Sequence, residues 1–401
     1  MNALLYLVLF GATLQLSEAQ NHAGCPCSDP SLCLPLDPPA RPTVETTAYI
    51  ASGADVYATN GSEWRHFDWS KIASVVEFAN VQSANDSYAM MCTAHEKGAR
   101  ILAFTPAGSW HNRSDRSCVV HPMNWNDRSS SKWLNRTLLR ETADHVGACV
   151  PAGGYDGVLF DDENTWAPGD PYRDAFQDYV CFVKAALNRT LPGNIVTMDT
   201  FFALDFEDYS KLYDGGCVDF FQPMEYGQCR AKCAPRDTTC ESLPLVINRA
   251  PSPIGMLKYS LDTYTHSFGV PASALAPVFD WACLCDFRCL DASCLQADDQ
   301  KTLGYGETEP LRARATRVWE NTTLMTKVAV YNVSSSVGGA GPPVKRQLWF
   351  DDPETLARKY AYALAAGARG VGLWTANAAL GGADPSLAMN AAMWAALPSV
   401  R

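Results

Sequence analysis

Three consecutive acids end an apolar, strand-like segment at residues 155–163 (YDGVLFDDE). Acidic residues are depleted from β-strands, so their accumulation here indicates a chemical role. Side chains alternate between the two faces of a strand, which places Asp161 and Glu163 on one face and Asp162 on the other. Because close carboxyl groups can hold different protonation states at one pH, Asp161 and Glu163 could perform acid–base chemistry together.

Apolar segments alternate with helix-like segments along the chain, which predicts an α/β fold with a parallel barrel. The predicted strands are residues 72–78, 100–104, 155–161, 195–200, 218–226, 274–281 and 370–374, with 48–52 as the candidate for the first strand. Helical spacing covers 134–149 and 353–367, and the second of these helices follows Asp352, a good N-cap residue with proline after it. In such barrels the chemistry lies at the carboxyl ends of the strands, where the three acids stand.

The spacing of Asp156, Leu159, Asp161 and Glu163 resembles the fourth-strand signature of glycoside hydrolase family eighteen, the chitinase family, which reads Asp-x-x-Asp-x-Asp-x-Glu. Leu159 stands where that signature has its second acid. The resemblance implies a (β/α)8 TIM barrel and a glycosidase that acts on β-linked N-acetylglucosamine.

Two further motifs resemble the same family, in the expected order. Met224 and Tyr226 are similar to the Met-x-Tyr motif at the end of strand six, and residues 370–374 (GVGLW) are similar to strand eight. Gly227 follows where the family commonly has aspartate. Outside the catalytic strands, segments such as 25–33 (CPCSDPSLC) resemble an exo-acting lysosomal branch of the family.

The resemblance implies a role for several residues at the strand ends. Glu163 would be the general acid, Asp161 would orient the 2-acetamido group of the substrate, and Tyr226 would hydrogen-bond its oxygen. The acetamido oxygen would itself be the nucleophile, so that no enzyme carboxylate attacks the sugar. Trp374 would form an apolar floor beneath the reactive sugar.

Three other side chains are candidates for contact with the substrate because they lie at predicted strand ends. Trp281 would be a second aromatic platform, while Met224 and Asp199 would line the floor of the site. Asp156 starts its strand and has the opposite parity to Glu163, so we interpret it as structural support.

The first residues predict entry into the secretory pathway. An apolar core at 4–14 precedes Ser17-Glu18-Ala19, which has the pattern of a signal-peptidase site, so residues 1–19 are interpreted as a signal peptide. Residues 20–401 would form a single catalytic barrel domain. Within it, residues 283–346 break the strand–helix rhythm and are expected to be an elaborated loop region, or insertion, after strand seven.

Fifteen cysteines in a chain with a signal peptide predict disulfides. The number is odd, and Cys92 and Cys181, which lie in apolar helix-like segments, are the candidates for free buried thiols. Cys283, Cys285 and Cys289 do not have a standard zinc spacing, so we expect disulfides there as well. No metal and no cofactor are predicted.

The net charge, the distribution of apolar residues and the sequons indicate the type of partner and the compartment. The net charge of -11 argues against nucleic acid, and no later run of about 18 apolar residues indicates a membrane span. Seven sequons predict N-glycosylation, and they begin at Asn60, Asn85, Asn112, Asn135, Asn188, Asn321 and Asn332. We expect a monomer, either lysosomal or secreted, whose partner is an N-acetylglucosamine oligosaccharide.

Three functions remain open at this point. The first is a retaining, substrate-assisted glycosidase that cleaves β-1,4-linked N-acetylglucosamine in the chitobiose core or in chitin oligosaccharides. The second is a catalytically impaired chitin-binding lectin with the same fold, which Leu159 and Gly227 keep open, whereas Glu163 favours an enzyme. The third is an endo-acting chitinase, which would differ in the shape of its cleft.

Overall fold

The computed structural model describes residues 25, 27–36, 42–51, 63–78, 84–105, 131–163, 166–227, 249–282, 284–294, 297–334, 342–379 and 388–400. The predicted signal peptide, the sequons at Asn60 and Asn112, and Cys283 lie outside these residues. All the predicted site residues lie within them.

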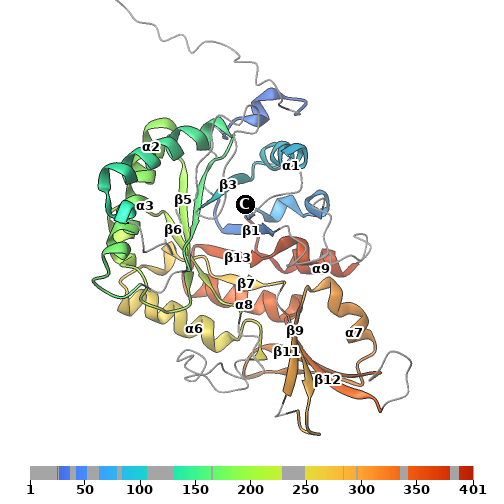
Figure 1. Ribbon diagram of the computed structural model, residues 1–401. Coiled ribbons are helices and arrows are strands. Elements are labelled where there is room, and N and C mark those ends of the chain that lie inside the picture. Colours follow the sequence, from blue (N-terminus) through green and yellow to red (C-terminus); the bar gives the residue numbers. More distant parts are fainter. Residues whose placement is uncertain are drawn as a thin grey trace, which may run out of the picture.

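Eight parallel strands form a closed barrel (Figure 1). They are β1 (Glu45–Ala51), β2 (Ser74–Phe78), β3 (Arg100–Thr105), β4 (Gly157–Asp161), β5 (Ile195–Phe201), β6 (Phe220–Met224), β7 (Val278–Asp280) and β13 (Gly370–Trp374). Strand β13 closes the barrel between β7 and β1. The predicted barrel is confirmed, and its first strand begins at Glu45 rather than at residue 48.

Helices connect the strands and surround the barrel (Figure 1). They are α1 (Ala84–Glu96), α2 (Arg136–Ala152), α3 (Pro171–Thr190), α4 (Tyr209–Asp214), α6 (Ile254–Asp262), α8 (Pro353–Ala365) and α9 (Ala388–Ala396). Helix α8 begins as predicted: the Asp352 side chain accepts a hydrogen bond from the backbone of Thr355, and Pro353 occupies the first turn.

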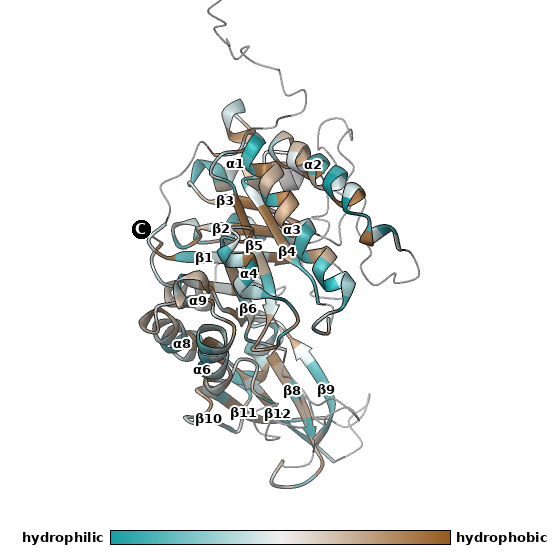
Figure 2. Ribbon diagram, turned by 90° about the vertical axis from the view of Figure 1, so that its left-hand side faces the viewer, coloured by the Kyte–Doolittle hydropathy of each residue, from teal (hydrophilic) through white to brown (hydrophobic). Residues whose placement is uncertain are grey.

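Strand alternation divides the apolar side chains of the barrel between two cores. Tyr49, Leu102 and Leu159 belong to a cluster inside the barrel. Val158 and Phe160, on the other face of β4, belong to the larger cluster between the strands and the helices. Strands β3, β4 and β5 are accordingly hydrophobic over much of their length (Figure 2). Because both faces of the strands are packed, a side chain reaches the site only at the carboxyl end of a strand.

Residues between β7 and α8 form a second sheet beside the barrel (Figure 1). Its strands are β8 (Leu284–Cys289), β9 (Ala297–Leu303), β10 (Arg317–Asn321), β11 (Thr326–Val333) and β12 (Val344–Phe350), accompanied by helix α7 (Glu309–Ala313). The strands pair antiparallel in the order β10-β11-β12-β8-β9. The segment with the broken rhythm therefore contains regular structure that the sequence analysis did not identify.

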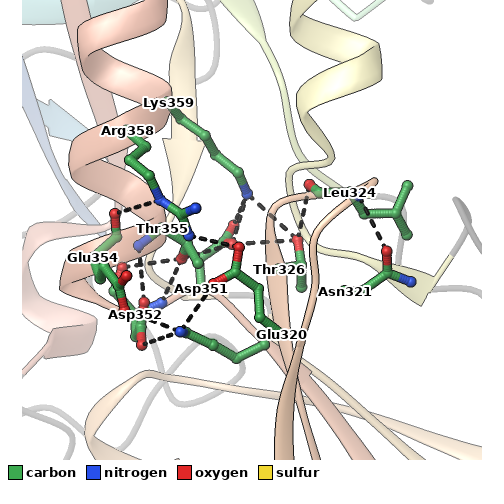
Figure 3. Close-up of polar contacts among 11 residues, drawn as sticks. Glu320, Asn321, Leu324, Thr326, Asp351, Asp352, Glu354, Thr355, Arg358 and Lys359 are labelled. Atoms are coloured by element: carbon green, nitrogen blue, oxygen red, sulfur yellow. Dashed lines mark hydrogen bonds and ion pairs between the residues drawn. The ribbon is translucent and has the colours of Figure 1, made fainter.

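A buried ion pair joins this sheet to the barrel (Figure 3). Lys359 of α8 donates to both carboxylate oxygens of Asp351, which follows β12, at 2.6 Å each. Both side chains are fully buried. Thr326, at the start of β11, and Thr355 of α8 donate to the same carboxylate at 3.3 and 3.2 Å. The pair thus fixes α8 against two strands of the added sheet.

Disulfides occur along the chain, as predicted. The described bonds join Cys25 to Cys33, Cys27 to Cys92, Cys181 to Cys217 and Cys289 to Cys294. The prediction of free thiols at Cys92 and Cys181 is wrong, because the fold brings another cysteine against the buried side of each helix.

Among the described residues, one group of side chains has the spacing of metal ligands, namely Cys25, Cys27 and Cys33. All three sulfur atoms are in disulfides and offer no thiolate. None of the described helices has an apolar segment long enough to cross a membrane.

Candidate active site

Strand β4 carries the predicted acids to the carboxyl end of the barrel. Leu159 packs inside the barrel, and Asp161, two residues further along, has the same inward parity. The side chain of Asp161 is partly exposed, but its Oδ1 atom is fully buried and accepts no hydrogen bond from a described residue. Glu163 follows at the rim and is exposed. Asp161 therefore has inward parity, while Glu163 lies two residues beyond it, after the end of the strand.

The outward neighbour of these two acids supports the loop after β4. Asp162 is buried, and its Oδ2 accepts a hydrogen bond from the indole Nε1 of Trp166 at 2.7 Å. Trp166 in turn stacks on Tyr172 of α3, with ring centroids 6.3 Å apart. The second acid of the run thus contacts Trp166 rather than facing the inside of the barrel.

Asp199 lies beside Asp161 on the neighbouring strand. The register of β4 and β5 pairs these two residues, and both have inward parity. Asp199 is only 3% exposed, so it lies below the floor of the site rather than on its surface. The hydroxyl of Tyr49, on β1, donates a short hydrogen bond to Asp199 Oδ1.

Three aromatic rings stand around these acids. Trp374, at the end of β13, is stacked with Tyr226 at a centroid distance of 6.0 Å and an interplanar angle of 9°. Its ring also meets Tyr49 edge-on at 5.6 Å. Tyr226 and Trp374 are partly exposed and pack on the inner core of the barrel. The arrangement offers a flat apolar surface with phenolic hydroxyls beside the carboxyl groups, which suits a sugar ring.

Burial and nearby negative charges raise the pKa values of the acids at this site. Burial raises the pKa of Asp161 to about 8, and the charges of Glu163 and Asp162 add to the rise. Burial also raises the pKa of Asp199 well above its usual range, with the charge of Asp161 as the next cause. The pKa of Glu163 is raised as well, first by desolvation and then by Asp162. Carboxyl groups that remain protonated at mildly acid pH are suited to proton donation.

The remaining predicted residues differ in their relation to the site. Met224, at the end of β6, is 8% exposed beside Tyr226 and can line the floor. Trp281 is completely buried: its Nε1 donates to Tyr360 of α8 at 3.0 Å, and its ring packs against Trp394 of α9. The structure therefore does not bring Trp281 to the site, because it follows β7 with outward parity.

Asp156 has the supporting contacts expected of a structural residue. Its carboxylate accepts backbone hydrogen bonds from Leu36 and Ile101, each at 2.7 Å, and one from His95 Nε2 at 3.0 Å. Gly227 adopts a φ of 82°, which side chains rarely tolerate.

Two inward residues at strand ends were missed by the sequence analysis. Tyr49 lies on β1, for which the sequence analysis predicted only a candidate range. Which face of β1 points into the barrel is decided by its pairing with β2 and β13. Asp280 ends β7 opposite Trp374 in register, and its Oδ1 accepts a hydrogen bond from the backbone of Ala282 at 2.9 Å. Counting parity from Val278, an inner-core residue, would have found Asp280.

Known proteins resemble this chain in sequence and in fold, although no family model matches it. The di-N-acetylchitobiase of Rattus norvegicus is 24% identical over 406 residues, covering 96% of this chain and 95% of the relative. A Cycas revoluta family-eighteen chitinase variant, solved with (GlcNAc)4, has a TM-score of 0.60 at 13% identity and covers 88% of this chain and 99% of its own. The chitinase-like agglutinin of Robinia pseudoacacia has a TM-score of 0.60 at 14% identity, covering 87% and 98%.

The two kinds of similarity agree with the motifs at the barrel mouth. Sequence similarity extends over nearly the whole chain, so it includes the added sheet as well as the barrel. The chain therefore has the fold of the family-eighteen chitinases and is similar in sequence to the di-N-acetylchitobiases over nearly its whole length.

Proposed function

We propose that this protein is a retaining glycosidase that hydrolyses β-1,4-linked N-acetylglucosamine in short oligosaccharides. The observation that supports the proposal is that Asp161 ends β4, with Glu163 two residues later, while the stacked rings of Tyr226 and Trp374 lie at the ends of other strands of the same barrel. The homologous di-N-acetylchitobiases and the (GlcNAc)4 complex of the Cycas revoluta enzyme support the same substrate class.

Glu163 begins the reaction as the acid. It protonates the glycosidic oxygen as the bond from that oxygen to the anomeric carbon breaks. The acetamido oxygen of the same sugar forms a bond to the anomeric carbon and closes a positively charged ring. The carboxylate of Glu163 then takes a proton from a water molecule that attacks this carbon, so two displacements retain the configuration.

The neighbouring groups stabilise the charged ring. Asp161, ionised at that stage, accepts a hydrogen bond from the acetamido N–H and offsets its positive charge. The hydroxyl of Tyr226 hydrogen-bonds the acetamido oxygen and orients it for attack. Trp374 packs against the apolar face of the sugar, and the stacked Tyr226 limits how its indole can turn.

A lectin is the competing function, since the Robinia pseudoacacia agglutinin has the same fold. Two features favour the enzyme: Glu163 is present, and its pKa is raised, as proton donation requires. Whether cleavage is exo or endo is a separate question, which product sizes decide.

The location and domain organisation are also part of the proposal. Residues 1–19 would direct a single-domain catalytic monomer of residues 20–401 into the secretory pathway, to the lysosome or the cell exterior. The described disulfides are consistent with an oxidising compartment. The exposed sequon residues Asn135, Asn188 and Asn332 are accessible to glycosylation.

Product analysis on N-acetylglucosamine oligomers at acid pH tests the reaction. We expect oligomers to shorten and the first product to appear as the β-anomer, as observed by proton NMR during the first turnovers. A matched oligomer with plain 2-hydroxyl groups should not be cleaved, because it cannot close the ring. Net inversion, or equal cleavage of the matched oligomer, would exclude the mechanism, and binding without any cleavage would favour the lectin.

A further inference from the structure

Two carboxyl groups lie next to each other beneath the candidate site. Asp161 and Asp199 are register partners on adjacent parallel strands, and both have inward parity. Adjacent strands are about 5 Å apart, so the two side chains rise from neighbouring positions on one surface. Neither forms a salt bridge with a described residue, and two buried carboxylates this close would repel each other.

The surroundings of the two acids are unequal. Asp199 Oδ1 already accepts the hydroxyl of Tyr49, whereas the buried Oδ1 of Asp161 accepts nothing from the described residues. Leu159 lies below Asp161 on β4 and belongs to the inner apolar core, so it offers no donor from beneath. An ionised Asp161 would therefore lack a partner unless a neighbouring group carried a proton.

Asp199 is the buried neighbour that can carry that proton. Among the described residues, the titratable groups that act on its pKa are Asp161, Tyr49 and Glu163, none of which is a cation. Desolvation and these like charges favour the neutral carboxylic acid at Asp199. Because Tyr49 donates to Oδ1, that oxygen acts as an acceptor, and the proton is left on Oδ2.

We propose that Asp199 is a positioning residue that remains protonated and donates a hydrogen bond from its carboxylic acid to Asp161. The proton stays on Asp199 throughout the reaction. Asp161 can then be the ionised member of the pair when positive charge develops on the acetamido group. This inference rests on the proposed function for the role of Asp161, but the protonation of Asp199 can be measured without it.

Tyr49 connects this acid pair to the sugar platform. Its ring contacts Trp374 edge-on at 5.6 Å while its hydroxyl holds Asp199. Tyr49 is 1% exposed and belongs to the inner core, so it has little freedom to turn. The hydroxyl fixes the orientation of the Asp199 carboxyl and therefore the direction in which its proton points.

Substitutions at Asp199 test whether this residue acts as a protonated carboxylic acid or as a charged carboxylate. Asp199→Asn keeps a donor in nearly the same shape, so we expect kcat within about 3-fold of wild type and an unchanged pH profile. Asp199→Leu removes the donor, so kcat should fall at least ~10-fold, and the acid limb of the pH profile should move to higher pH by about one unit. Tyr49→Phe should give a smaller decrease in kcat and a smaller shift of the acid limb.

Glu225→Gln is the matched control. Glu225 is also fully buried, and burial raises its pKa to about 8, but it lies beside Ser260 of α6 on the outer side of the barrel. Its substitution should leave kcat and the pH profile unchanged. Melting curves of every variant identify losses that come from unfolding.

Infrared spectra of protein labelled with 13C at the aspartate carboxyl groups measure protonation directly. A protonated-carboxyl band should be present at pH 6, and the part of its intensity that comes from Asp199 should be lost in Asp199→Asn. Equal impairment in Asp199→Asn and Asp199→Leu, or an unchanged band in Asp199→Asn, would overturn this inference. A wild-type protein that cleaves no N-acetylglucosamine oligomer would overturn the proposed function instead, and the infrared result would still decide the protonation of Asp199.

Discussion

Buried carboxyl groups occur at two places in this protein, with opposite arrangements around them. At the junction of the barrel and the added sheet, Asp351 is fully buried and accepts two hydrogen bonds from Lys359. At the mouth of the barrel, the partly exposed Asp161 lies beside the buried Asp199, and neither forms an ion pair with a described cation. The first site compensates a buried charge with its opposite, whereas the second places like charges together.

The comparison separates a structural role from a functional one. A compensated pair has little chemistry to offer, because neither member changes its charge easily, but it specifies how two elements meet. Uncompensated acids cost stability, and they hold protons at a pH where ordinary carboxyl groups have lost them. Removal of a charged group should therefore lower the stability of the fold at the first site and raise it at the second.

The largest effect is expected from breaking the junction pair. Lys359→Met leaves Asp351 buried without its cation, which should reduce the free energy of unfolding by about 3–5 kcal/mol. Denaturant unfolding of the variant and wild type measures the difference. Turnover by the folded fraction should stay near wild type, since Asp351 and Lys359 form no part of the candidate site.

A control lies one residue away on the same helix. Arg358 pairs with Glu320 in a salt bridge in which the arginine side chain is 41% exposed, so Arg358→Met should cost less than about 1 kcal/mol. Replacing both junction residues, as in Asp351→Leu with Lys359→Met, should recover most of the loss, because no unpaired charge remains. A cost for Lys359→Met no greater than that for Arg358→Met would contradict the structural role.

Glu163→Gln should have the largest effect on chemistry at the mouth of the barrel. An amide cannot protonate the glycosidic oxygen, so kcat should fall at least ~10²-fold while affinity for an oligosaccharide is nearly unchanged. Steady-state kinetics and calorimetric binding measure the two quantities. Turnover within a few fold of wild type would exclude Glu163 as the proton donor.

Tyr226→Phe should cost less, because it removes one hydrogen bond and keeps the stacked ring. We expect kcat to fall by about 10-fold to 10²-fold, the range for a hydrogen bond to a group that becomes charged. Tyr259→Phe provides a matched control, since this tyrosine is 60% exposed on α6, away from the site. Equal activity of both variants would exclude a role of the Tyr226 hydroxyl in the reaction.

Local pattern was sufficient to predict much of the barrel and part of its mouth. Alternation along β4 predicted the inward parity of Asp161, and the Asp352 cap predicted the start of α8. These inferences depend on a few neighbouring residues, whose geometry is fixed by the backbone itself.

Features that depend on distant parts of the chain could not be predicted in the same way. The proximity of Asp199 to Asp161 follows from the register of β4 and β5, and the contact of Tyr49 with Asp199 follows from barrel closure. Trp281 was predicted at the site, but the pairing of β7 with β6 and β13 determines where β7 ends and which of its side chains point into the barrel. The partners of Cys92 and Cys181 likewise come from other segments of the fold.

The smallest expected effect is a gain in stability when an acid is removed from the mouth of the barrel. In the folded protein without substrate, burial raises the pKa of the Asp161 carboxyl to about 8, whereas in the unfolded chain this pKa is near ~4. The folded state therefore binds more protons between these values, and its stability falls as pH rises. Between pH 5 and pH 8, the free energy of unfolding of Asp161→Asn should fall by about 1–3 kcal/mol less than that of wild type. Unfolding experiments at the two pH values measure this difference. Asp156→Asn should instead destabilise the fold, because one of the two oxygens that accept hydrogen bonds from Leu36, Ile101 and His95 becomes an amide nitrogen that cannot accept them. Equal pH slopes for Asp161→Asn and wild type would show that Asp161 is not held protonated.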